Sequence, residues 1–157
     1  VGVGMDYVTD DYAVGVWIGD SPDDDVSIEV AGKYTGVENF TFYAAIADDP
    51  GYQTLNFWGS YVVSNYTFAL EWVDVDNTFG SDSTGYLAMA NYAWDQAAVT
   101  LRYSIEETDG FDEDWKLITV SPSYSFSDNL LGLLELSFIQ SESPSDWQAA
   151  VEVLYMF

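Results

Sequence analysis

The chain has 157 residues, and its 27 Asp and Glu against three Lys and Arg give a formal net charge of −24 at neutral pH. It contains no Cys and no His, which excludes disulfides, thiolate or histidine metal sites, and nucleophiles activated by histidine. So large a negative charge also excludes nucleic acid as a partner, while 48% hydrophobic and 17% aromatic residues exceed what an acidic disordered chain carries.

Apolar and polar residues alternate with a period of two along most of the chain, and helical periodicity is absent. In chain order the expected strands are 1–8, 12–19, 26–35, 39–47, 53–64, 66–74, 84–94, 97–106, 115–126, 130–140 and 147–157. Most approach the roughly nine to eleven residues that a tilted strand needs to cross a bilayer, and no apolar run is long enough for a membrane helix. The pattern predicts an all-β fold, a transmembrane antiparallel up-and-down β-barrel.

Short and long connections are expected to alternate between these strands. The short ones are 9–11, 36–38, 64–65, 95–96 and 127–129, and the long ones are 20–25, 48–53, 75–83, 107–114 and 141–146. Most of the acidic residues lie in or next to the long connections. Membrane barrels show this asymmetry, with tight periplasmic turns at one rim and longer extracellular loops at the other.

The two faces of the strands differ sharply in character. One parity is almost wholly apolar, as in Val14, Phe42 and Leu70, and is expected to face lipid. The other parity is expected to line the lumen, and its polar and aromatic members are Asp6, Trp17, Glu29, Lys33, Tyr43, Asn56, Trp58, Glu71, Asn91, Arg102, Glu135 and Glu152. A Lys or Arg at the bilayer midplane would cost about 2–4 kcal/mol, which explains why charge is confined to the inward parity and the rims.

Aromatic residues of the outward parity bracket the short connections and predict a girdle at one membrane interface. They are Tyr7 and Tyr12, Tyr34 and Phe40, Tyr61 and Tyr66, Tyr92 and Trp94, and Tyr124 and Phe126. The inward Trp17, Tyr43 and Trp58 are less expected beside water. They either constrict the lumen, pack against a plug, or fill a narrow barrel.

The last expected strand alternates up to Phe157, with Tyr155 two positions before it. This ending resembles the C-terminal signature of Gram-negative outer-membrane β-barrel proteins. The hairpin 121–135, with its Asp-Asn turn and inward Glu135, is similar to the closing hairpin of β-barrel porins. The resemblance implies residence in the lipid of the bacterial outer membrane, and it implies that the barrel-insertion machinery reads Tyr155 and Phe157 as its insertion signal.

Barrels of this kind end in the periplasm and have an even number of strands. Counting back from the last strand, segment 1–8 begins at the extracellular rim. We therefore expect residues 1–157 to form a single barrel domain that lacks one or more N-terminal strands, supplied by preceding sequence or by another chain, and a complete barrel of about twelve strands or more. The alternative is one miscounted strand within 1–25.

The leading functional hypothesis is a porin-like channel for passive diffusion of small solutes, favouring cations because inward carboxylates outnumber Lys33 and Arg102. One alternative is a non-conducting barrel that holds a protein partner, or a further copy of the chain, within a larger outer-membrane assembly. Another is a soluble acidic β-sandwich.

No enzyme activity, cofactor or metal site is predicted. Glu71, Glu135 and Glu152 are interpreted as lumen lining rather than as a glycosidase pair. Segment 74–80 lacks the Gly and Glu positions of a calcium loop, and the acidic runs 23–25 and 112–114 are interpreted as a solvated rim.

Overall fold

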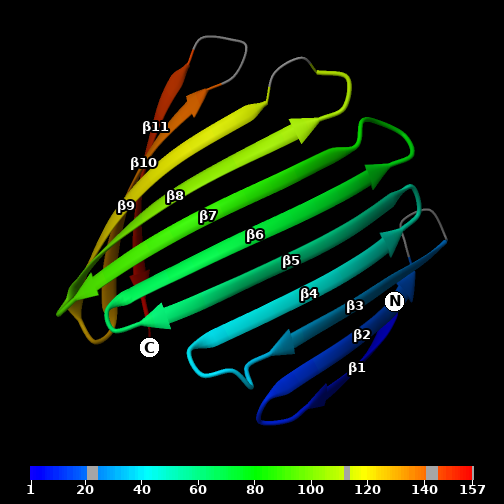
Figure 1. Ribbon diagram of the computed structural model, residues 1–157, viewed down its shortest axis with the longest axis horizontal. Helices are drawn as coiled ribbons and strands as arrows, with labels where there is room; N and C mark the ends of the chain where they lie inside the picture. Colours follow the sequence, from blue (N-terminus) through cyan, green and yellow to red (C-terminus); the bar gives the residue numbers. More distant parts are fainter. Residues whose placement is uncertain (21–24, 112–113, 141–144, 157) are drawn as a thin grey trace.

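The computed structural model describes residues 1–20, 25–111, 114–140 and 145–156. They form one antiparallel sheet in which each strand pairs with its neighbours in sequence, from β1 to β11 (Figure 1). The strands are β1 (Gly2–Val8), β2 (Tyr12–Asp20), β3 (Val26–Tyr34), β4 (Phe40–Asp49), β5 (Tyr52–Val63), β6 (Tyr66–Asn77), β7 (Ser83–Trp94), β8 (Ala97–Thr108), β9 (Trp115–Ser127), β10 (Leu130–Gln140) and β11 (Asp146–Tyr155). All the expected strands are confirmed. Within the described residues no helix is long and apolar enough to cross a membrane.

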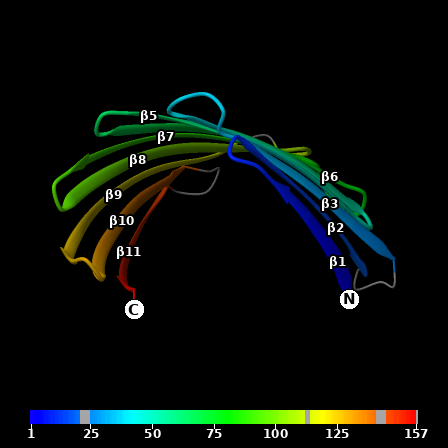
Figure 2. The same cartoon turned by 90° about the horizontal axis from the view of Figure 1, so that it is seen from below.

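The sheet bends into an arch, with β1 and β11 at its two separate edges (Figure 2). In the described part of the chain, β1 pairs only with β2, and β11 pairs only with β10. Each of these edge strands therefore presents one row of backbone N–H and C=O groups without a partner strand.

The strand register places every predicted lumen residue on the same face of the sheet. Opposed residues in an antiparallel ladder share a face. Successive opposed pairs link Asp6 on β1 to Glu152 on β11, and the register shift at Leu130 and Leu131 lies at the β9–β10 turn, outside these pairs. The most buried side chains of the described residues, such as Thr119 at 1% exposure, belong to this same face. We call it the inward face, because such burial is expected on the concave side of the arch.

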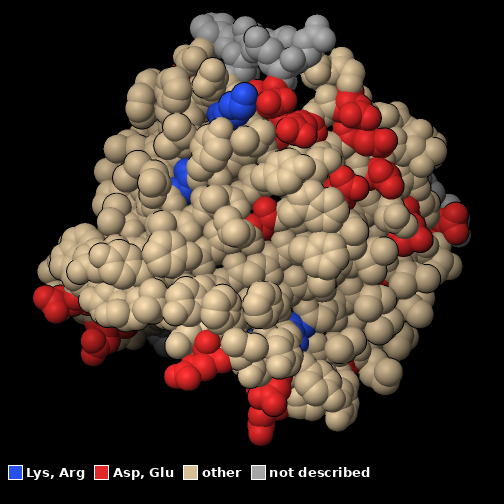
Figure 3. All heavy atoms as spheres, viewed as in Figure 1, with Lys and Arg blue, Asp and Glu red and all other residues tan. Residues whose placement is uncertain are grey.

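The outward face is apolar over its central band. Val14, Phe42, Phe57 and Leu70 are each more than 40% exposed there. Seen from the convex side, most of the visible Asp and Glu lie near the two rims (Figure 3). An exposed apolar band between polar rims is the surface that a membrane-spanning sheet requires.

Strands β6 and β8 extend further than the sequence pattern predicted, to Asn77 and Thr108. Asp74 therefore lies within β6 on the outward face, where its carboxylate accepts a 2.8 Å hydrogen bond from the hydroxyl of Thr84 on β7. These paired polar residues continue the ladder past the apolar band on the side of the long connections.

The connection between β4 and β5 was expected to be a loop over 48–53, which is wrong. Asp48 and Asp49 stay in β4, and only Pro50 and Gly51 separate that strand from β5. Gly51 has a φ of +84°, and Pro followed by a Gly with positive φ is the sequence of a type II turn. Short and long connections therefore do not alternate strictly.

The aromatic residues around the short turns form the predicted girdle on the outward face. Phe40 and Tyr61 have ring centroids 4.4 Å apart, and those of Tyr66 and Tyr92 are 4.6 Å apart. Backbone hydrogen bonds join neighbouring turns at this rim, such as Ala93 N–H to the carbonyl of Asn65 at 2.9 Å. These contacts hold each hairpin turn in register with the turn of the next hairpin.

Candidate functional site

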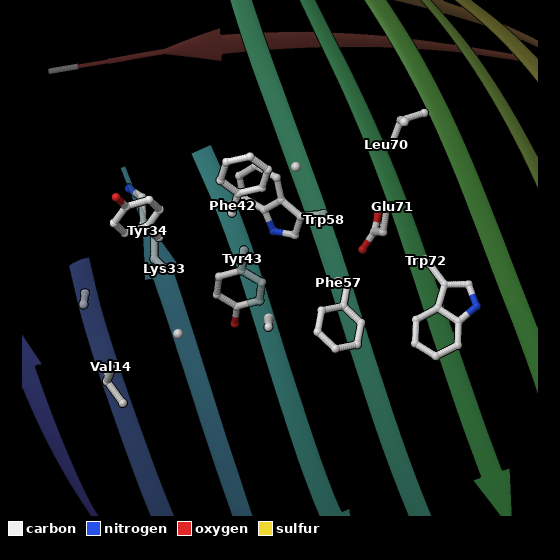
Figure 4. Close-up of a pocket in the computed structure, with 14 residues that line it drawn as sticks. Val14, Lys33, Tyr34, Phe42, Tyr43, Phe57, Trp58, Leu70, Glu71 and Trp72 are labelled. Carbon is white, nitrogen blue, oxygen red and sulfur yellow. The ribbon is translucent and has the colours of Figure 1, made fainter. Parts of the chain in front are cut away.

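The centre of the inward face carries two aromatic rings between two opposite charges. The register places Lys33 of β3 opposite Tyr43 of β4, Tyr43 opposite Trp58 of β5, and Trp58 opposite Glu71 of β6. The Tyr43 and Trp58 rings are stacked with centroids 5.9 Å apart and an interplanar angle of 25°. We call these four residues the central row; Figure 4 shows them on four adjacent strands.

Glu71 is held in place by the neighbouring strand. The side-chain amide of Asn56 on β5 donates a 2.7 Å hydrogen bond to its carboxylate, and both residues are half-buried. An amide donor orients a carboxylate and leaves its net charge intact. Glu71 therefore remains an anionic group on the wall.

Glu71 is among the lining residues of two hollows. One, of about 570 Å³, is lined by the central row and Ala13 of the inward parity and, in larger number, by outward residues such as Val14, Phe42 and Leu70 (Figure 4). The other, of about 470 Å³, crosses β6 to β9, and all of its lining residues except Tyr86 and Ile105 belong to the inward parity. The second hollow includes Glu106, an inward carboxylate at the end of the strand expected over 97–106.

Trp17 lies apart from the central row. It stands opposite Gly4 on β1 and Glu29 on β3. A methyl group added at Gly2 or Gly19 would collide with its indole. Trp17 therefore lies close against the backbone at these glycines, which fits the interpretation that large inward residues fill space.

A second polar group forms on β8 to β10, where three side chains converge. Arg102 and Glu135 are 3.6 Å apart, each with a side chain 35% exposed, and the hydroxyl of Ser121 donates to the same Glu135 oxygen at 3.5 Å. Next to them the hydroxyls of Thr119 and Ser137 are 2.9 Å apart and buried. Of the two predicted inward cations, Arg102 has a carboxylate partner among the described residues and Lys33 has none.

The remaining predicted lumen residues are spread over the face. Asn91 donates a 2.8 Å hydrogen bond to the hydroxyl of Thr100. The Asp6 carboxylate leans over Gly15, which leaves it room. Glu29 and Glu152 lie on β3 and β11. The structure thus gathers the predicted residues into a central row and a β8–β10 group and leaves the others separate.

The expected insertion signal is only partly within the described residues. Tyr155 ends β11 opposite Leu130 and is 65% exposed on the outward face. Phe157 lies outside the described residues, as do 23–24 and 112–113 of the acidic runs.

An up-and-down sheet with an apolar outward band, an aromatic girdle and a polar inward face defines the class of transmembrane β-barrel proteins. Residues 1–142 match the family model described as Gram-negative porin. The chain belongs to this family, and its location is the bacterial outer membrane. No curated protein matches the chain.

Several solved structures share the fold at low sequence identity. A porin refined at 1.8 Å resolution has a TM-score of 0.78 and 14% identity, over 98% of this chain and 60% of its own. An anion-selective porin from Comamonas acidovorans has a TM-score of 0.83 and 12% identity, over 99% and 59%. A KdgM porin has a TM-score of 0.60 and 13% identity, over 99% and 91%. The chain thus spans about three fifths of the first two structures.

Proposed function

We propose that the chain forms the wall of an outer-membrane channel through which small solutes diffuse passively. The observation that carries the proposal is the placement of polar and charged side chains on one face of a membrane-spanning sheet whose other face is apolar. Such a face needs water against it, and a lumen supplies that water. No catalytic step is part of the proposal.

The lumen is proposed to favour cations. Inward carboxylates, which include Asp6, Glu29, Glu71, Glu106, Glu135 and Glu152, outnumber the inward cations Lys33 and Arg102. Pore selectivity follows the charges that line the lumen. One structurally similar porin is described as anion-selective. The fold alone therefore does not set the charge selectivity, and we propose that the charges lining the lumen set it.

The arch is proposed to be part of a closed barrel. Backbone groups without partners cannot face hydrocarbon, because each costs several kcal/mol there. The free edges of β1 and β11 therefore require further strands between them, from the same polypeptide or another chain, giving a barrel of about twelve strands or more.

Single-channel recording in a planar bilayer tests the channel, using protein purified from outer membranes. Stepwise conductance is expected, with a reversal potential in a salt gradient that indicates cation preference. Absence of conductance steps would contradict the channel, and an anion-selective reversal potential would contradict the lining argument alone.

The same recording addresses the alternative of a barrel that holds a protein partner. The observation favouring it is the pair of aromatic rings, Tyr43 and Trp58, on the lumen wall. A protein that never conducts and that copurifies with a second chain in fixed ratio would support the scaffold.

A further inference from the structure

The central row places opposite charges on either side of an aromatic platform. Lys33 and Glu71 are separated by three strand-to-strand steps, which is about 14 Å between their backbones. Tyr43 and Trp58 occupy the two positions between them, with planes only 25° apart. The two stacked rings therefore form one apolar cluster on the inward face, with a cation on the strand before it and an anion on the strand after it (Figure 4).

Neither end of the row is neutralised by a described neighbour. Lys33 is exposed, and none of the ion pairs in the described part of the chain involves it. Glu71 has a neutral amide, that of Asn56, as its hydrogen-bond partner. Both charges are thus available to a solute, in contrast to Arg102, which is 3.6 Å from Glu135.

The platform is unusual for a wall that faces water. Tyr43 and Trp58 are half-buried, so part of each ring remains accessible on the inward face. Covering exposed apolar surface with a solute is favourable, because that surface is removed from water. The hollow over β6 to β9 lies next to the row, on the far side of Glu71, and leaves the inward face open there.

We infer that the central row is a binding station for short zwitterionic peptides with an aromatic or apolar side chain. The inference rests on the proposed channel and names a solute class for it. The peptide carboxylate pairs with Lys33, its ammonium pairs with Glu71, and its side chain lies over Tyr43 and Trp58. Two or three extended residues span about 7–10 Å, and the long, exposed Lys33 side chain closes the rest of the roughly 14 Å gap estimated from strand spacing.

A neutral sugar is the competing solute, because its apolar ring face could also cover the aromatic platform. It would satisfy hydrogen bonds but would leave the charges of Lys33 and Glu71 without counter-charges. Charge-assisted hydrogen bonds are roughly twice as strong as neutral ones. The opposite charges at the two ends of the row therefore favour the zwitterion.

Single-channel recording with added glycyl-phenylalanine tests the inference. Transient, concentration-dependent occlusion of the current is expected. The N-acetylated peptide loses the ammonium, and the C-terminal amide loses the carboxylate. Each is expected to occlude roughly two- to fivefold more weakly, because each loses one partly exposed ion pair.

Charge-removing variants of the protein locate the station. Glu71→Gln and Lys33→Gln are each expected to weaken occlusion by the zwitterion roughly two- to fivefold. The matched controls Glu38→Gln, in the β3–β4 turn, and Lys116→Gln, at the far end of β9, are expected to leave occlusion unchanged. Heat-modifiable gel migration verifies that each variant folds. If a variant fails to fold, the comparison of the three peptide forms on the unchanged protein still tests the inference.

Several results would overturn the inference. Equal occlusion by all three peptide forms would remove the role of the charges, and stronger occlusion by a disaccharide would assign the platform to neutral sugars. A conducting pore that the peptide never occludes would refute the station and leave the channel intact, whereas a protein without conductance steps would refute the channel itself.

Discussion

Leu70 offers the sharpest test of which face meets lipid. It lies on β6 between Tyr66 at the girdle and Asp74 beyond the apolar band, and it is 66% exposed on the outward face. Its chain neighbour Ala69 points to the inward face, opposite Ser60 and Met89. The same substitution at these adjacent positions therefore places one ammonium in hydrocarbon and the other in the lumen.

Leu70→Lys is expected to lower the free energy of unfolding by about 2–4 kcal/mol, the cost of a cation near the bilayer midplane. Since about 1.4 kcal/mol is a factor of ten, the folded-to-unfolded ratio falls roughly thirtyfold to several hundredfold. Ala69→Lys is expected to change stability by less than about 1 kcal/mol, because solvent screens a charge in the lumen.

Urea titration of each variant in phospholipid vesicles, followed by tryptophan fluorescence, measures both free energies. Equal destabilisation of the two variants would refute the face assignment. A larger loss of unfolding free energy for Ala69→Lys than for Leu70→Lys would reverse the face assignment.

Two further predictions concern the β8–β10 group. Thr119→Val removes a partner from the buried Ser137 hydroxyl and is expected to lower the free energy of unfolding by about 1–3 kcal/mol. In the same titration, adding Ser137→Ala should restore part of that loss, and an unchanged midpoint for Thr119→Val would contradict the hydrogen bond. Arg102→Gln and Glu135→Gln are each expected to alter stability by less than about 1 kcal/mol, because both side chains are one-third exposed. Their reversal potentials should move in opposite directions, Arg102→Gln towards cations and Glu135→Gln towards anions, and a common direction would contradict the placement of both charges in the lumen.

The strands and their faces could be predicted from sequence because both depend on one local signal, the period-two alternation. The errors arose where polar residues continue a ladder outside the membrane. Asp48 and Asp49 read as loop residues, yet they remain paired in β4 because Pro50 and Gly51 close a tight turn. Asp74 was placed at the end of its strand, yet β6 continues past it to Asn77.

The grouping of the lumen residues could not be predicted in the same way. Residues 33, 43, 58 and 71 become neighbours only through the register of four strands, and alternation does not specify register between hairpins. Trp17 looked equivalent to Trp58 in the sequence. The glycines at 2 and 19 leave room for its indole close to the backbone. That contact becomes visible only when β1 and β2 are paired.

Thiol accessibility along β6 tests the central claim most directly, because the chain has no Cys and each introduced thiol is unique. Single cysteines at positions 67 to 72 of the membrane-inserted protein would be treated with a water-soluble, membrane-impermeant maleimide. The account predicts labelling at 67, 69 and 71, which face the lumen, and protection at 68, 70 and 72, which face lipid. Uniform labelling, or the opposite alternation, would contradict a sheet with one face to lipid and the other to an aqueous lumen.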